Sequence, residues 1–96
     1  MKRVVRWTRR ARHRLDEIGA RISLDNPEAA GRIVGTIALA IQRLGTSPGR
    51  GRPGRVQDTR ELVVVGTPYI VAYRVHSNDI EILTIQHGAQ LWPESF

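Results

Sequence analysis

The fold of this chain is decided by the stretch from Arg60 to Trp92, which reads R-E-L-V-V-V-G-T-P-Y-I-V-A-Y-R-V-H-S-N-D-I-E-I-L-T-I-Q-H-G-A-Q-L-W. Two turn signals, Gly66-Thr67-Pro68 and His76-Ser77-Asn78-Asp79, divide it into three short runs rich in Val, Ile and Tyr. Apolar runs separated by such turns are typical of consecutive antiparallel strands. We therefore predict strands at about 60–65, 69–75 and 80–87, and we expect any functional chemistry to lie on this sheet.

The first half of the chain predicts two helices. Apolar residues recur at helical spacing after Thr8, a natural N-cap, which predicts a helix over roughly 9–24. Asn26 as N-cap and Pro27 at the first helical position start a second helix, and Gly45 suits its C-terminal end. Two helices joined by so short a link are antiparallel neighbours. Two stretches remain: a β-prone run at about 3–7 that we expect to join the sheet, and a Gly- and Pro-rich loop at about 46–59.

These elements predict a single α+β domain over residues 1–96. An N-terminal αα-hairpin packs on an antiparallel sheet of about four strands, in the order β-α-α-β-β-β. The chain has no cysteine, which excludes disulfides and thiolate catalysis. No apolar run approaches the roughly 20 residues that span a bilayer, and the N-terminus lacks a signal peptide. We therefore expect a soluble, cytoplasmic protein that does not bind membranes.

The charge balance indicates an anionic partner. The net charge is +6, and Lys2 is the only lysine among the 15 basic residues. The planar donor fork of arginine suits carboxylates and phosphates. A GC-rich genome explains arginine in place of lysine but does not explain the excess of positive charge. The partner classes that follow are nucleic acid and an acidic protein segment.

Motifs for nucleotide, metal or cofactor binding are absent from the sequence. It holds no Walker motif, no Gly-rich dinucleotide fingerprint, no H-E-x-x-H and no EF-hand loop. The three histidines, His13, His76 and His87, stand apart from any ligand at metal-binding spacing. We therefore predict neither a metal nor a cofactor.

The run 69–75 predicts a binding surface. Strand alternation places its Tyr and Val residues on one face, and Ile70, Ala72 and Arg74 on the other. If the Tyr/Val face packs on the helices, the second face is open and partly apolar, as a binding groove is. We predict a partner-binding surface made of Arg60, Ile70, Ala72, Arg74 and His87.

A catalytic interpretation of the same residues stays open. His87 could act as a general acid in phosphodiester cleavage, with Arg60 and Arg74 stabilising the charge on the phosphorane. The alternative, which we favour, is a structural histidine that hydrogen-bonds the turn after the last strand. The Gly49–Arg55 loop clamps phosphate on one interpretation and is a solvated loop on the other. The Arg9–Arg14 cluster is best interpreted as a solvated helix face.

The chain resembles the RelE/ParE superfamily of type II toxin–antitoxin toxins along nearly its whole length. The order and spacing of several segments carry the resemblance, and no single segment is decisive. These segments are Val5–Thr8, Leu15–Ile18, Asp25–Ala30, Gly51–Arg55, Thr59–Val63, Tyr69–Val75 and Ile82–Ala89. The resemblance implies a toxin silenced in a hetero-oligomer with a cognate antitoxin, whose acidic C-terminal segment wraps it.

The resemblance also separates two branches. RelE-like members are ribosome-dependent mRNA endonucleases, whereas ParE-like members act on DNA gyrase without a recognised catalytic set. The nucleases usually carry Arg where this chain has Ile70, and some carry Tyr where it has Gly88. The ParE-like pattern often has Arg-Asp where this chain has Gln90-Leu91.

The departures from the nuclease pattern imply the ParE-like branch, a gyrase-binding inhibitor with no favoured catalytic residues. One alternative is an mRNA endoribonuclease acting at the ribosome through Arg60, Arg74 and His87. The other is an inactive relic that only binds its antitoxin.

Overall fold

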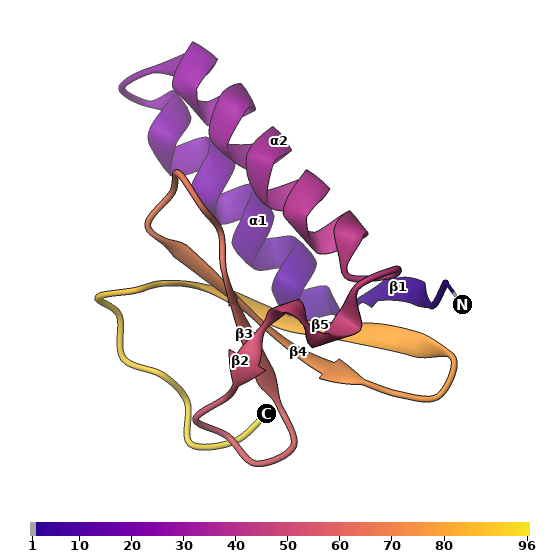
Figure 1. Cartoon of the computed structure of the whole chain (residues 1–96). Helices are drawn as coiled ribbons and strands as arrows, with labels where there is room; N and C mark the ends of the chain where they lie inside the picture. The colour runs from indigo at the N-terminus through magenta and orange to yellow at the C-terminus, as the bar shows by residue number, and fades with distance from the viewer. Residues whose placement is uncertain (1) are drawn as a thin grey trace.

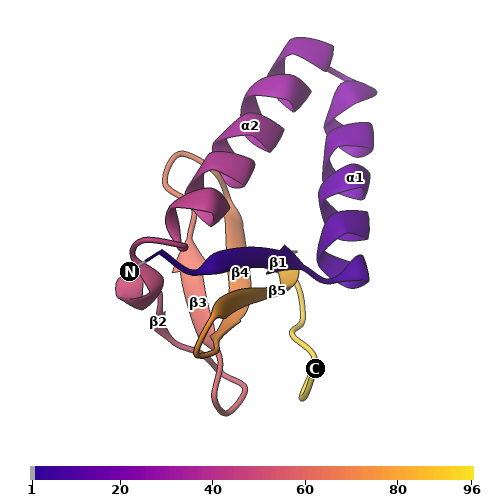
Figure 2. The same ribbon diagram turned by 90° about the vertical axis from the view of Figure 1, so that its right-hand side faces the viewer.

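A five-stranded sheet carries both helices on one of its faces (Figure 1). The computed structural model describes residues 2–96. The elements along the chain are β1 (Val4–Trp7), α1 (Arg9–Ser23), α2 (Pro27–Arg43), the 3₁₀ turn η1 (Pro48–Arg50), β2 (Arg52–Pro53), β3 (Arg60–Val63), β4 (Tyr69–Val75) and β5 (Asp79–His87). Figure 2 shows the two helices standing as a hairpin over the same side of the sheet.

The sheet differs from the prediction in two respects, although the α+β fold itself is confirmed. Its strand order is β1-β5-β4-β3-β2, and β1 runs parallel to β5, so the sheet is mixed. The fifth strand, β2, lies in the stretch predicted as a loop and pairs through two residues only, with Arg60 and Glu61. Pro53 has no N–H to donate, which confines β2 to the edge of the sheet.

Both helices begin at the predicted caps. The Thr8 hydroxyl accepts the Ala11 N–H at 3.1 Å and donates to the Ile82 carbonyl at 2.6 Å, so it ties the start of α1 to β5. The Asn26 side chain accepts the Ala29 N–H at 3.1 Å at the start of α2. Neither helix, nor any other between residues 2 and 96, is long and apolar enough to cross a membrane.

Gly45 ends α2 for a reason that the sequence did not reveal. Its φ angle is not in the left-handed region that makes glycine favourable after a helix. Instead, a Cβ at this position would lie 2.7 Å from the Arg3 carbonyl oxygen. The Arg3 N–H donates to the Gly45 carbonyl at 2.7 Å, so the glycine lets the N-terminal segment approach the end of α2 closely.

The core lies between the helices and the sheet. Helix residues Ile37 and Ile41 and strand residues Val71, Ile82 and Ile85 are all fully buried in it. Burying each such side chain contributes about 1.5–3 kcal/mol. The predicted packing of the Tyr/Val face of β4 on the helices is confirmed over residues 69–73.

Candidate functional site

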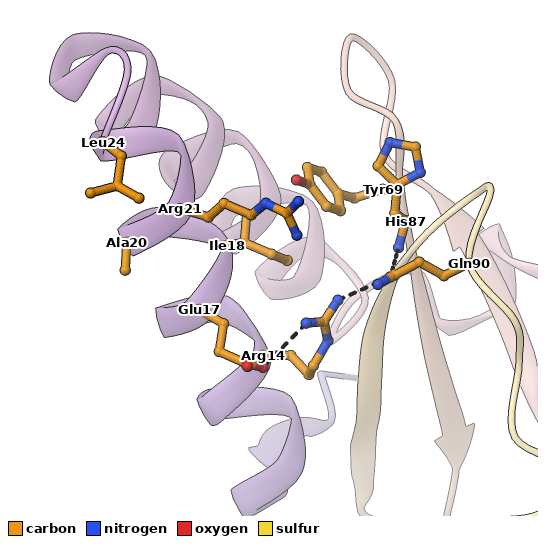
Figure 3. A pocket seen from close by; sticks show the side chains of 9 residues that line it. All are labelled: Arg14, Glu17, Ile18, Ala20, Arg21, Leu24, Tyr69, His87 and Gln90. Atoms are coloured by element: carbon orange, nitrogen blue, oxygen red, sulfur yellow. Dashed lines mark hydrogen bonds and ion pairs between the residues drawn. The ribbon is translucent and has the colours of Figure 1, made fainter.

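A groove separates α1 from the ends of β4 and β5 (Figure 3). Its volume is ≈ 800 Å³. The residues that line it are Arg14, Glu17, Ile18, Ala20, Arg21, Leu24, Tyr69, His87 and Gln90. A groove of this size that combines apolar surface with a few charged groups is the usual form of a binding site.

The helical side of the groove presents a cation above apolar surface. Ile18 and Arg21 are three residues apart and therefore share a face of α1. In Figure 3 the Arg21 guanidinium extends from α1 across the groove towards Tyr69, above Ile18. No salt bridge among residues 2–96 involves Arg21. Arg21 is thus a donor available to a carboxylate from outside the chain.

The strand side of the groove is aromatic. Tyr69 and His87 are register partners across β4 and β5, and their rings meet edge to face with centroids 5.6 Å apart. The Ala89 N–H donates to His87 Nδ1 at 3.1 Å and closes the turn after β5. This hydrogen bond is the contact with the turn that the structural interpretation of His87 predicts.

Arg14 connects α1 to the end of β5 along the groove. Its Nε donates to the Ile85 carbonyl at 3.0 Å, and its two terminal nitrogens donate to Glu17 at 3.2 Å and to the Gln90 amide oxygen at 3.0 Å. The same oxygen of Gln90 accepts the His87 N–H at 2.7 Å. The prediction of a solvated Arg9–Arg14 face is therefore wrong for Arg14, because this side chain joins α1 to the end of β5.

Two members of the predicted binding surface are not on a surface. Ile70 is 8% exposed and Ala72 is 0% exposed, so the prediction of an open face at these residues is wrong. Ala72 pairs with Glu61 on β3 and with Thr84 on β5, and both of these partners are also buried. The face of the sheet opposite the helices is therefore covered by the chain itself at this row.

The cover includes the segment after β2 and the C-terminal segment after β5. Glu61, which is 2% exposed, accepts the Arg55 N–H at 2.7 Å and lies 3.3 Å from the Arg52 guanidinium. The Arg55 guanidinium stacks on Trp92, 4.4 Å from the ring centroid. Two arginines of the loop interpreted as a phosphate clamp are thus engaged by a carboxylate of the chain. A one-dimensional alternation pattern cannot reveal such a cover, since it depends on distant segments.

The proposed nuclease residues do not converge. Arg60 pairs with Tyr73 and His87 with Tyr69, so both are on the helix side of the sheet, whereas Arg74 is on the opposite side. Tyr69 and Tyr73 are four steps apart along β4, which separates Arg60 from His87 by roughly 13 Å along the strand direction. The Arg60 guanidinium also donates to the Gly51 carbonyl at 2.7 Å. The alternative of one nuclease site built from Arg60, Arg74 and His87 is therefore not supported by this arrangement.

The described residues bring together no group of three His, Asp or Glu side chains that could hold a metal ion. The α1 groove offers groups that suit binding. It offers one free guanidinium, apolar surface from Ile18 and Leu24, and the edges of two aromatic rings.

The chain matches a toxin family over most of its length. Residues 5–92 match the family described as ParE toxin of type II toxin-antitoxin system, parDE. Y4kP, a candidate toxin of Sinorhizobium fredii (strain NBRC 101917 / NGR234), is 53% identical over 90 residues, which cover 94% of this chain and 93% of the relative. A chain of the chromosomal ParDE TA system from P. aeruginosa superposes with a TM-score of 0.82 at 30% identity, over 90% of this chain and 96% of that one.

A more distant likeness concerns the fold alone. The toxin–antitoxin complex RelBE2 from Mycobacterium tuberculosis contains a chain with a TM-score of 0.64 at 24% identity, over 91% of this chain and 99% of that one.

Proposed function

The chain belongs to the ParE toxin family of type II toxin–antitoxin systems, and we propose that it inhibits growth by binding DNA gyrase until a cognate antitoxin occupies its α1 groove. The observation that carries the antitoxin part is the free guanidinium of Arg21 over an apolar groove. The P. aeruginosa relative comes from a ParDE toxin–antitoxin system, which supports a partner of this kind.

The expected antitoxin segment is acidic, apolar on one side and disordered before binding. A carboxylate of this segment pairs with Arg21, and an apolar side chain lies on Ile18 beside Tyr69. The net charge of +6 accelerates the encounter with an acidic chain and makes its rate fall with salt. Folding on binding costs part of the interaction energy but lets a short segment cover a long groove.

The choice of gyrase rests on binding rather than catalysis. The departures at Ile70 and Gly88 from the nuclease pattern support a target that is bound and not cut. The separation of Arg60, Arg74 and His87 supports the same choice, because general acid catalysis needs its groups within hydrogen-bond reach of one substrate. Both the target and the toxin would then be in the cytoplasm, and the toxin would have no catalytic residues.

The target is tested by expressing the chain without antitoxin. We expect filamentous cells, an induced DNA-damage response and intact mRNA, and we expect the purified chain to inhibit supercoiling by purified DNA gyrase. Cuts in mRNA at the ribosomal A site would reject gyrase in favour of the endoribonuclease. Normal growth of cells that contain the folded protein would indicate a relic.

The groove is tested by charge reversal. Arg21→Glu should weaken antitoxin binding at least tenfold, since a charge-assisted hydrogen bond contributes about 1.5–3 kcal/mol. Arg12→Glu is the matched control, because Arg12 is exposed on the same helix but does not line the groove. Arg12→Glu changes the net charge by the same amount as Arg21→Glu. Equal affinities of the two variants, measured by isothermal titration calorimetry, would place the antitoxin elsewhere.

A further inference from the structure

The outer edge of β3 is left open where β2 ends. β2 pairs only with Arg60 and Glu61, and within residues 2–96 no other strand pairs with Leu62 and Val63 on that side. The Val64 N–H donates to the Tyr69 carbonyl of β4 at 3.0 Å. Because antiparallel pairing alternates in direction from residue to residue, the N–H and C=O of Val63 point away from β4. They are available to a strand from another molecule.

The side chains at this edge are apolar and exposed. Val63 is 48% exposed, Val65 is 87% exposed, and Leu39 on the adjacent face of α2 is 49% exposed. These residues lie along a second groove, of ≈ 190 Å³, between α2 and β3. Exposed strand edges are usually protected by charged side chains, by proline or by a covering segment. Residues 62–65 include neither a charged residue nor a proline, and within residues 2–96 no strand beyond β2 pairs with this edge.

The opposite edge of the same sheet shows the usual protection. β1 exposes Val4, but the next outward residue is Arg6, which pairs with Asp79 at 2.9 Å and is 3.6 Å from Glu81. A charged side chain of this kind disfavours pairing with a further strand. Residues 62–65 at the β3 edge carry no comparable charged side chain of their own.

The charges around the second groove favour an acidic occupant. Arg43 at the end of α2 and Arg50 in η1 line it, and no acidic residue does. In a second copy of the chain, these arginines would meet arginines of the same surface and repel them. A protein segment with acidic residues beside its apolar ones has the complementary charge.

We propose that the β3-edge surface, formed by Leu39, Arg43, Arg50, Val63 and Val65, binds an extended acidic and apolar segment of the protein that this toxin inhibits. The segment adds a strand antiparallel or parallel to β3, with hydrogen bonds to Val63 and apolar side chains against Val65 and Leu39. This inference rests on the proposed function in assigning the α1 groove to the antitoxin.

The two grooves lie on either side of one hairpin. Tyr69 of β4 lines the α1 groove, whereas Val63 at the end of β3 and Val64 and Val65 after it line the other. This hairpin, formed by β3 and β4, can be followed in Figures 1 and 2. An antitoxin bound in the α1 groove leaves the edge of β3 unpaired. It neutralises the toxin because its bulk prevents a large target from approaching the same hairpin.

The experiment compares a double variant at the edge, Val63→Lys with Val65→Lys, with Val4→Lys at the opposite edge. Both Val65 and Val4 are exposed and Val63 is half exposed, so lysine heads reach water and the fold is kept. Arg50→Glu is a second variant that leaves the strand unchanged. Circular dichroism melts verify folding, growth after induction reports toxicity, and calorimetry reports antitoxin affinity.

We expect the double variant and Arg50→Glu to raise viable counts after induction at least tenfold, with antitoxin affinity unchanged, and Val4→Lys to behave as wild type. Full toxicity of the folded double variant would overturn the inference. Joint loss of antitoxin binding would also overturn it, by assigning the edge to the antitoxin.

The growth comparison does not depend on the identity of the target. If the wild-type chain stops growth but leaves purified gyrase active, the gyrase proposal fails while the variants still decide the role of the edge. If gyrase is inhibited, adding gyrase to the toxin should slow hydrogen exchange at the Val63 amide. An unchanged exchange rate would contradict strand addition. Normal growth with the wild-type chain would overturn both proposals.

Discussion

The hydroxyl of Tyr73 joins the segment before β2 to the centre of the sheet. It donates to the Pro48 carbonyl at 2.7 Å and accepts the Gly51 N–H at 2.8 Å. The Tyr73 side chain is fully buried. Only glycine fits at position 51 without a shift of neighbouring atoms, because a Cβ there would lie 2.6 Å from the hydroxyl oxygen. Tyr73→Phe removes this oxygen and keeps the ring.

The expected loss of stability in Tyr73→Phe follows from the two backbone groups that it leaves without hydrogen-bond partners. A buried group that loses its hydrogen bond costs about 1–3 kcal/mol. The Pro48 carbonyl belongs to a surface turn and can regain a water molecule, so the lower end of the range applies to it. We expect the free energy of unfolding to fall by about 2 kcal/mol. For a chain of this length, this lowers the melting temperature by roughly 10 °C.

Urea unfolding followed by circular dichroism measures this loss. Tyr69→Phe is the matched control, because the Tyr69 hydroxyl makes no hydrogen bond within residues 2–96, and we expect less than about 0.5 kcal/mol for it. Equal stabilities of the two variants would refute the reasoning. So would a large change in the urea slope, since it would mean that the native or denatured state had changed in compactness.

Alkaline pH supplies an independent measurement. Burial raises the pKa of Tyr73, against the opposing effects of the Gly51 N–H and the Arg60 charge. The unfolded chain therefore loses the phenolic proton first, near pH 10. The stabilising contribution is complete below that pH and is lost as pH rises through the folded pKa, by about 1.4 kcal/mol per pH unit. Tyr73→Phe should lack this component of the pH dependence.

Three further predictions concern local structure. Thr8→Ala should cost about 1–2 kcal/mol and more than Asn26→Ala, because Thr8 caps α1 and also bonds β5; urea unfolding of both variants tests this ranking. Gly45→Ala should destabilise the chain by about 1–3 kcal/mol, since its methyl group would lie 2.7 Å from a carbonyl oxygen. Gly35→Ala, in open space on α2, should instead stabilise the chain by about 0.5–1 kcal/mol. Thermal melts in which both variants shifted the melting temperature in the same direction would contradict the packing argument. Trp92→Ala should cost about 0.5–1 kcal/mol through the lost stacking of an arginine, and tryptophan fluorescence of the wild type should change when urea first loosens the C-terminal segment.

The sequence was sufficient for the helices and for the strands that face the core. Thr8 and Asn26 act as caps through side-chain hydrogen bonds to residues three positions later, and such contacts are local. The alternation in β4 correctly placed Val71 and Tyr73 against the helices. Local patterns succeed here because the residues that interact are neighbours along the chain.

The same patterns failed for the opposite face of the sheet. Ile70 and Ala72 follow the alternation of a one-sided strand, yet both are buried. Their cover comes from segments far away in sequence, including the loop held by Glu61 and the C-terminal segment that stacks Trp92 on Arg55. No periodicity within β4 carries information about those segments.

The binding grooves were likewise decided by the tertiary structure. No pattern in the sequence indicated that Arg14 joins α1 to Gln90 while Arg21, seven residues later, stays free. The sequence also could not show that β2 ends before Val63 and leaves that edge open.

The strands of Arg60–Trp92, the helical hairpin and the basic charge were thus determined by the sequence alone, because each depends on residue types and on spacings within one element. Which faces remain open to a partner was decided only when distant elements packed, because burial depends on every segment that reaches a surface.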